Sequence, residues 1–287
     1  MARFGTFVLA LGRSVSAPFM KLSHLAIQPL ASMALLCLLA AGRALAQDPF
    51  EIHVYDYETL KPGQFTIEQH LNYWAIGSKQ FDGTLAPTND QLHMTYELTG
   101  AITDHISLGF MQLNAVLPGS GFEYAGWRVL PHFYAPDSWG LPVELGLIAE
   151  FSFARPQFIE DTAHVELRPI VQRKIKDVDV VFNPVFARGL RGTGVGEGWS
   201  FEPAARAAYG DSDTKRVVPY VEWYSELGPV TDLSPASRQV HQLFPGADFK
   251  LASRLVWSVG PGVGLTSEGP RLVFKSRLEF EFGRHEK

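Results

Sequence analysis

The stretch RLVFKSRLEFEF, residues 271–282, carries the pattern that decides the fold. Apolar or small side chains occupy every second position, and the positions between them are mostly charged. One set is Leu272, Phe274, Ser276, Leu278, Phe280 and Phe282, and the other is Arg271, Val273, Lys275, Arg277, Glu279 and Glu281. Because successive side chains of a β-strand point to opposite faces, this period of two predicts a strand with one apolar face and one charged face.

The same alternation recurs along most of the chain, and helical periodicity does not. It is clearest in 91–99, 143–153 and 255–265. Applied throughout, it predicts twelve strands of about 9–13 residues, close to the length with which a tilted strand crosses a bilayer. They cover 64–74, 91–99, 106–116, 122–134, 141–153, 164–175, 178–188, 199–209, 216–227, 239–250, 255–265 and 270–282.

The predicted connections differ between the two ends of the strands. After the even-numbered strands they are short, near 103–104, 137–138, 176–177, 211–213 and 252–253. After several odd-numbered strands they are longer, at 75–90, 154–163, 189–198 and 228–238, whereas 117–121 and 266–269 are short. Short turns at one end and longer loops at the other are typical of outer-membrane barrels. We therefore expect an all-β protein, an antiparallel transmembrane β-barrel of about 12 strands.

A soluble barrel has the same periodicity with the apolar face turned inward, so the alternation alone does not separate the two. Large and often aromatic residues on the apolar face favour lipid contact. Aromatic residues near predicted strand ends could form the interface girdles: Tyr73, Trp74, Tyr134, Trp139, Trp199, Tyr209, Trp223 and Tyr224. The ending Leu278-x-Phe280-x-Phe282 resembles the signal that the barrel-assembly machinery reads, although five residues follow it.

The N-terminal residues 1–46 are predicted to be a signal peptide for export to the cell outer membrane. Lys21 precedes the short apolar run 30–41, and the small residues of Ala44-Leu45-Ala46 suit a cleavage site. The true start of the chain is then Met20. After the signal we expect a periplasmic lead at 47–62, the barrel at 63–283 and a C-terminal tail at 284–287.

Composition excludes several classes of protein. The one cysteine, Cys37, lies in the predicted signal, so the mature chain has no disulfide, cysteine zinc site or cysteine nucleophile. The whole chain has a formal net charge of −5. Residues 1–46 contain four basic residues and no acidic one, so the mature chain is more acidic still. An acidic body argues against a nucleic-acid partner.

Three segments resemble a known family. They are YELTGAITDHISLGF (96–110), LPVELGLIAEFSF (141–153) and VGPGVGLTSEGPRLVFKSRLEFEF (259–282). They look like Gram-negative outer-membrane proteins of the group named for the meta-pathway of phenol degradation. The resemblance covers most of 60–283 and implies a barrel with a transport-like function. It carries no site residues.

Charged side chains on the polar face are the candidate lumen lining, because charge facing lipid is costly. The candidates are Glu68, Glu97, Glu144, Glu150, Glu166, Arg168, Glu202, Arg206, Glu222, Lys275, Arg277, Glu279 and Glu281, joined by His70, Asp248 and Lys250. These are ten acidic and five basic residues with His70 neutral, which predicts a weak cation preference if the lumen is open. The alternative is a salt-bridged interior that closes the barrel.

One proline falls in each of eight consecutive predicted strands. They are Pro131, Pro142, Pro169, Pro184, Pro203, Pro219, Pro245 and Pro261. Proline removes a donor from the strand ladder and is expected at bulges. The prolines therefore mark either bulges that bend the wall or an irregular belt at a constriction of the lumen.

Candidate sites for metals, cofactors or catalysis are few. His70, His93, His132 and His241 fall within strands and His105 and His164 at strand edges, without a metal-binding spacing, so no metal site and no cofactor are expected. The glycine-rich run 192–198 lacks the following helix that a phosphate loop needs, and is expected to be an outer loop. Lipid-modifying barrels use a serine beside a histidine, and only His105 and Ser107 offer that pair. We do not expect an enzyme.

Three functions remain in order of preference. The first is a passive or weakly selective channel for small solutes. The second is a closed structural or surface-interaction barrel, and the third is a lipid-modifying outer-membrane hydrolase. The expected partners are outer-membrane lipid, the barrel-assembly machinery and small solutes of unknown identity.

Overall fold

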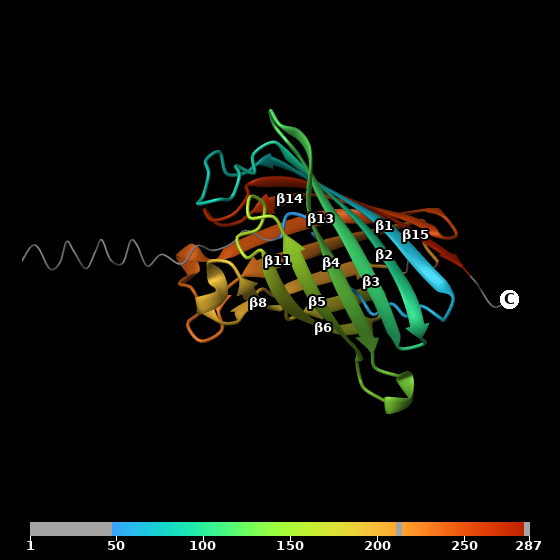
Figure 1. Ribbon diagram of the computed structural model, residues 1–287. Coiled ribbons are helices and arrows are strands. Elements are labelled where there is room, and N and C mark those ends of the chain that lie inside the picture. The colour runs from blue at the N-terminus through green and yellow to red at the C-terminus, as the bar shows by residue number, and fades with distance from the viewer. Residues whose placement is uncertain (1–47, 211–213, 284–287) are drawn as a thin grey trace, which may run out of the picture. The chain divides into compact units, whose positions relative to one another are not determined.

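The computed structural model describes residues 48–210 and 214–283. The predicted signal peptide at 1–46 and the tail at 284–287 lie outside the described residues. Within them the chain is a single antiparallel sheet whose strands tilt round a barrel (Figure 1). The strands are β1(Gln64–Ile76), β2(Gln91–Thr103), β3(Ile106–Leu117), β4(Gly121–Tyr134), β5(Glu144–Ala154), β6(Ala163–Ile175), β7(Val178–Asn183), β8(Phe186–Arg191), β9(Ser200–Phe201), β10(Ala204–Tyr209), β11(Val217–Glu226), β12(Gly228–Pro229), β13(Val240–Ala252), β14(Leu255–Gly264) and β15(Leu272–Gly283).

The barrel wall consists of twelve full-length strands, called here staves. Three of these staves are interrupted, so each of them is made of a pair of short strands. They are β7 with β8, β9 with β10, and β11 with β12. The ring closes where β1 pairs with β15 along its length, from Gln64 opposite Gly283 to Ile76 opposite Leu272. The predicted twelve-stranded antiparallel barrel is confirmed, and the predicted strands agree with the staves to within a few residues.

The lengths of the connections also follow the prediction, with one exception. Residues 104–105, 176–177 and 253–254 make tight turns at one end, called here the turn end. Residues 77–90, 155–162, 192–199 and 230–239 make longer connections at the other, the loop end. The exception is 135–143 at the turn end, which the sequence predicted to be short. It contains the 3-10 helix η1(Asp137–Trp139), and β5 consequently begins at Glu144.

Most of the eight prolines lie where the pairing of the wall is interrupted, which both interpretations of the prolines predict. Pro184 and Pro203 separate the two halves of their staves. Ladder pairing lapses around Pro131 between β4 and β5, and around Pro245 and Pro261 between β13 and β14. Pro142 precedes β5, and Pro219 lies within a continuous ladder with β13. Pro169 pairs continuously with β5, but on the other side of β6 the pairing lapses around it, between Leu167 and Val171.

The two faces of the wall settle which kind of barrel this is. Outward positions carry large apolar side chains that no other part of the described chain covers, such as Phe65, Leu108, Phe110, Phe151 and Phe280. Inward positions carry buried polar and charged side chains, which is the reverse of a soluble barrel. The described residues contain no helix long and apolar enough to cross a membrane.

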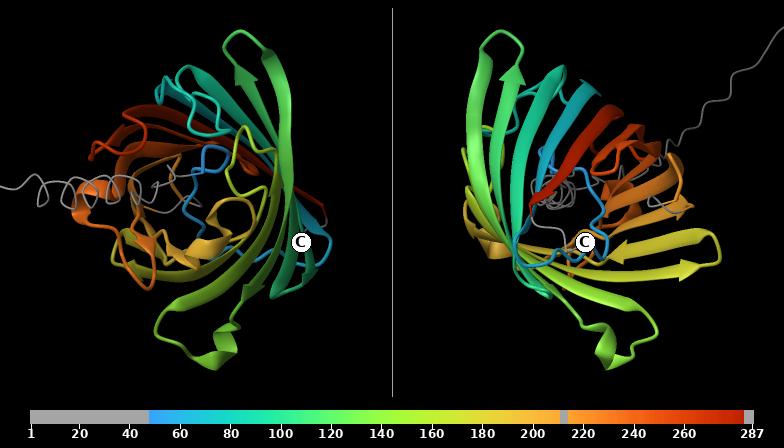
Figure 2. Two further views of the ribbon diagram at one scale, coloured as in Figure 1. Left: turned by 60° about the vertical axis from the view of Figure 1, so that its left-hand side comes forward. Right: turned by 90° about the vertical axis from the view of Figure 1, so that its right-hand side faces the viewer.

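The segment before β1 runs through the barrel interior. The sequence predicted a periplasmic lead at 47–62, but residues 48–60, called here the plug, lie inside the ring of strands, where Figure 2 shows them in blue. Near its start Phe50 packs against Phe158 in a loop-end connection, with ring centroids 5.9 Å apart. Near its end Tyr57 donates a hydrogen bond to the Ala135 carbonyl at the turn end (2.7 Å). The plug therefore passes through the lumen toward the turn end, where β1 begins.

Candidate functional site

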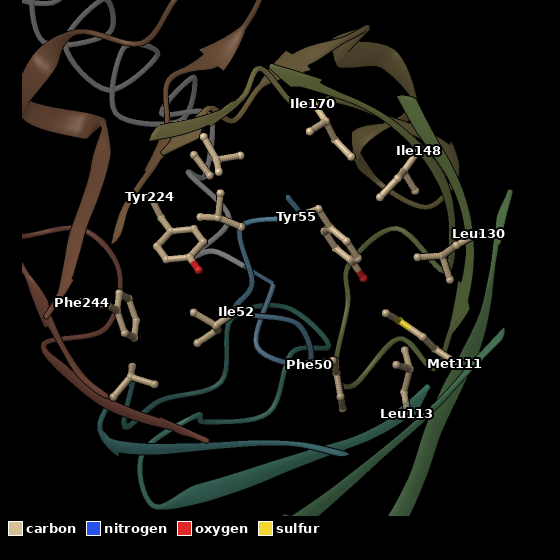
Figure 3. Close-up of a cluster of buried hydrophobic side chains, with 14 of the residues drawn as sticks. Phe50, Ile52, Tyr55, Met111, Leu113, Leu130, Ile148, Ile170, Tyr224 and Phe244 are labelled. Atoms are coloured by element: carbon tan, nitrogen blue, oxygen red, sulfur yellow. The ribbon is translucent and has the colours of Figure 1, made fainter. Parts of the chain in front are cut away.

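The wall offers the plug an apolar patch on its inner face. Met111, Leu113, Leu130, Ile148 and Ile170 point inward from β3, β4, β5 and β6 and are buried. The apolar plug side chains of this cluster are Phe50, Ile52, Val54 and Tyr55, and Figure 3 shows several of them facing the wall across the interior. Burying apolar side chains on both partners stabilises the plug in the lumen.

Side chains of the wall satisfy the plug's backbone, since the plug does not join the sheet. Asn183 on β7 accepts a hydrogen bond from the Tyr55 amide (2.8 Å) and donates one to the Tyr55 carbonyl (2.9 Å). Thr95 on β2 donates to the Phe50 carbonyl (2.8 Å), and Gln172 on β6 accepts from the Tyr57 amide (2.6 Å). Buried backbone groups that lacked such partners would cost free energy, so these contacts define the path of the plug.

The strongest charged contacts between plug and wall involve Glu51. Its carboxylate lies 2.8 Å from a nitrogen of Arg128 on β4 and 3.2 Å from one of Arg168 on β6. Arg128 is 0% exposed and also pairs with Asp48 of the plug and with Glu150 on β5 (3.1 Å). A buried guanidinium requires such partners because the desolvation of an unpaired charge is costly.

The network continues along β6. Arg168 pairs with Glu166 (2.9 Å), and the His164 ring lies 3.6 Å from Glu166 and 3.8 Å from Glu150. We call Glu51, Arg128, Glu150, Glu166 and Arg168 the anchor cluster. Glu51 comes from the plug and the other four residues come from β4, β5 and β6, and Asp48 of the plug also contacts Arg128.

A second ionic cluster lies across the lumen. Arg206 on β10 pairs with Glu222 on β11 (3.6 Å) and with Asp248 on β13, and Lys275 on β15 pairs with Glu222. We call these four residues the wall cluster. The ion pairs within this cluster join one wall strand to another. Its link to the plug is a hydrogen bond from the Lys275 ammonium to the Ile52 carbonyl (3.3 Å).

A third group lies at the seam between β1 and β15. Arg277 on β15 pairs with Glu68 on β1 (3.0 Å) and with Glu279 (2.7 Å). His70 lies next to Glu68 on the same face of β1. Tyr55 of the plug donates to Glu97 on β2 (3.3 Å), so the plug reaches this side of the wall through its phenol.

The structure places the candidate lumen residues on the inner face, at different depths. Those buried are Glu68, His70, Glu97, Glu150, Glu166, Arg168, Glu222, Asp248 and Lys275. Those partly buried are Glu202, Arg206, Lys250, Arg277, Glu279 and Glu281, and Glu144 is exposed at the turn end of β5. The sequence reasoning omitted Arg128 and the plug acids Asp48 and Glu51. Arg128 could have been found as the charged position in the stretch 124–131, which contains no other charged residue.

The remaining sequence candidates are the pair His105 and Ser107 and the glycine-rich run 192–198. His105 lies in the turn before β3 and makes no hydrogen bond with Ser107. Ser107 is buried and pairs in the ladder with His132. The glycine-rich run 192–198 forms a loop with the four-residue 3-10 helix η2(Gly194–Glu197), and the Gly194 amide donates to Asp161 (2.9 Å).

Comparison with known proteins bears on the fold. No protein-family model matches the sequence, and no curated protein matches it. An outer membrane channel of Pseudomonas putida F1, known from a crystal structure, superposes with a TM-score of 0.53 and 12% identity over 81% of this chain and 100% of that one. The KdgM porin in complex with oligogalacturonate gives a TM-score of 0.45 with 10% identity, over 77% of this chain and 99% of that one. LpxR from Salmonella typhimurium gives 0.41 with 9% identity, over 75% of this chain and 99% of that one. At such identities the first of these likenesses concerns the fold, which is that of the outer-membrane β-barrels.

Proposed function

We propose that this protein is an exported channel of the Gram-negative outer membrane that passes small solutes when its plug leaves the lumen. The observation that carries the proposal is the way in which the plug is held. Its charged and polar groups contact polar side chains of the wall, through Glu51, the Tyr55 backbone and the Phe50 carbonyl. Water and ions can replace these contacts, so the wall behind the plug is suited to an aqueous pore.

The lumen wall supports the same proposal. Its anchor and wall clusters contain both signs of charge and lie at the depth of the membrane-spanning strands. Rings of charged side chains are a means by which pores select ions. The plug adds Asp48, Glu51, Asp56 and Glu58 and no lysine or arginine, so the plugged lumen is the more acidic state. We expect cation preference to be greatest while the plug is inside.

A permanently closed barrel is the second candidate. The burial of Phe50, Ile52 and Val54 on the inner apolar patch favours it, because this packing resembles a core more than a gate. The resemblance of three segments to the phenol meta-pathway group supports the channel instead. A hydrolase has no comparable support, because His105 and Ser107 do not contact each other through a hydrogen bond.

The deciding experiment compares single-channel conductance in planar bilayers. The chain beginning at Gln47 is refolded beside a variant that lacks residues 48–58. We expect rare, small openings from the full chain and steady, larger ones from the deletion variant. Gel mobility with and without heating checks that both have folded as barrels.

A second deletion is the matched control. Residues 80–86 belong to the 77–90 loop, whose ends are joined by the Ser78 amide and the Thr88 hydroxyl (2.9 Å), so the loop can be shortened without separating β1 from β2. Shortening it should leave conductance at the full-chain level. A folded plug deletion that does not conduct would contradict the proposal and favour the closed barrel.

A further inference from the structure

Two histidines and a glutamate meet between the plug and the wall. His53 comes from the plug, and Glu68 and His70 come from β1. Each residue offers one ligand atom, and these atoms all lie within 4.8 Å of one another. All three side chains are buried. His53 lies well before Glu68 and His70 in the sequence and outside the strand that carries them, so no motif spacing indicated that the three residues meet.

One nitrogen of each imidazole makes no hydrogen bond, although Nε2 of His70 lies within ion-pair distance of Glu68 and Glu97. Nδ1 of His53 is buried and makes no hydrogen bond. Nε2 of His70 lies 3.1 Å from Glu68 Oε2 but lacks the alignment of a hydrogen bond. Buried polar atoms without a hydrogen bond are uncommon because each costs free energy. A metal ion that accepts the lone pairs of both imidazole nitrogens, next to the Glu68 carboxylate, would remove that cost.

We propose that His53, Glu68 and His70 bind a divalent transition-metal ion, with Zn²⁺ as the reference ion, and that this ion fastens the plug to β1. Two imidazole nitrogens and one carboxylate are a ligand set that zinc uses when its fourth position remains open. Zinc ligand atoms lie about 3–3.5 Å apart, so the three side chains close by an ångström or so when the ion enters.

A small cavity adjoins the set and supplies the remaining space. Its volume of about 30 Å³ leaves room for a water molecule, and its lining includes His53, Glu68 and Glu97 but not His70. Asp56 and Glu58 of the plug line it as well. A water in this cavity would occupy the fourth position, and the carboxylates around it favour the approach of a cation.

The neighbouring positive charge does not block the site. Arg277 lies 3.0 Å from Glu68 but 2.7 Å from Glu279, so it keeps a partner when Glu68 turns to a metal ion. Two further groups of His, Asp and Glu have comparable spacing, namely Glu150 with His164 and Glu166, and Asp48 with Glu51 and Glu150. In both of these, Arg128 or Arg168 already contacts the carboxylates as a cation. Of the three groups, the one formed by His53, Glu68 and His70 is the one with two imidazole nitrogens that make no hydrogen bond.

The inference rests on the proposed function for its gating role, but metal binding is measured separately. The full refolded chain is titrated with Co²⁺, whose visible absorption reports nitrogen and oxygen ligands in a four-coordinate site, and with Zn²⁺ in competition. His53→Ala should weaken binding by at least about 100-fold, since one of two imidazole ligands is lost. His93→Ala is the matched control, because His93 is buried with an unpartnered nitrogen but belongs to none of these sets.

Conductance is the second readout. Zn²⁺ should reduce openings of the full chain about tenfold, a chelator should restore them, and His53→Ala should respond less than twofold. His53→Gln repeats the test with a polar side chain, in case the alanine variant folds poorly. Metal binding equal in His53→Ala and wild type would overturn the site. Binding that depends on His53 in a barrel that never conducts would support the site and contradict the channel.

Discussion

The two ionic clusters of the lumen connect different parts of the protein: the anchor cluster joins the plug to the wall, and the wall cluster joins wall strands to one another. In the anchor cluster, Glu51 of the plug lies between Arg128 and Arg168, so the plug completes the charge balance of β4–β6. In the wall cluster, Arg206, Glu222, Asp248 and Lys275 balance one another without a plug carboxylate. The plug is therefore bound through charges on β4–β6, whereas its polar contact with the wall cluster is the hydrogen bond from Lys275 to the Ile52 carbonyl.

In the proposed channel, ion pairs of the same kind would hold the plug on one side of the lumen and stabilise the wall on the other. Breaking the anchor cluster should release the plug while leaving the barrel closed. Breaking the wall cluster should weaken the barrel while leaving the plug in place.

Arg128→Met should have the largest effect. It leaves the buried Glu51 and Glu150 without this guanidinium, and removing one partner of a buried ion pair costs about 3–5 kcal/mol. Glu51 can leave the lumen with the plug, whereas Glu150 is fixed in β5. We therefore expect the lost stabilisation to appear as release of the plug. Single-channel recordings should approach those of the plug deletion, and protease should cut within residues 48–60.

Arg206→Met is the matched control for that prediction, because it breaks the wall cluster in the same way. It should lower the temperature or denaturant concentration at which the barrel loses its heat-modifiable mobility, without raising conductance. Equal plug release by both variants would abolish the distinction between the clusters.

Glu51→Gln should produce an intermediate effect. The amide keeps the shape of the side chain but removes the charge that faces Arg128 and Arg168, and a hydrogen bond to a charged group is worth about 1.5–3 kcal/mol. We expect more frequent openings than in wild type and fewer than in Arg128→Met. Glu222→Gln, which removes the central carboxylate of the wall cluster, should leave the opening frequency unchanged.

Asn183→Ala should have a smaller effect on the plug. It removes the acceptor for the Tyr55 amide and the donor to the Tyr55 carbonyl, each worth about 1 kcal/mol. Opening frequency should rise severalfold, and hydrogen exchange at the Tyr55 amide should become faster. An unchanged exchange rate would mean that Asn183 does not hold the plug.

The double change Glu279→Gln with Glu281→Gln should give the smallest effect, on selectivity alone. Both positions lie on the inner face of β15 toward the turn end. Neutralising them should move the reversal potential in a salt gradient toward the anion value, by less than about twofold in permeability ratio. Glu268→Gln in the loop before β15 should not change it.

The sequence predicted the barrel well because strand alternation is a local property. Each stave shows its two faces in its own residues, and the turns between staves are tight, as at 104–105 and 176–177. The predicted strand 122–134 is β4, whose inner face mixes Arg128 with Leu130 and His132. Arg128 was overlooked there, because its partners Asp48 and Glu51 come from a distant segment.

The plug could not be found by the same reasoning. Residues 50–54 also alternate, with Phe50, Ile52 and Val54 between Glu51 and His53, but they pair with no strand in the described structure. Their position depends on side chains from β2, β4, β6 and β7 that meet only once the ring has closed. The metal-binding set was beyond sequence reasoning for the same reason, since His53 approaches His70 only when the plug is inside.

In the proposed channel, the short connection between the plug and β1 would make the plug a tethered competitor of any solute that binds in the lumen. Residues 61–63 separate Leu60 from Gln64, so a displaced plug stays close to its binding site. Short tethers of this kind correspond to effective concentrations in the millimolar range. A solute that only replaces Glu51 at Arg128 must therefore exceed about millimolar concentration to keep the lumen open, while one that also fills the inner apolar patch can do so at lower concentration. In the proposed channel, passage of a solute then depends on how the free solute competes with the tethered plug. The length of the tether sets the solute concentration at which the lumen stays open.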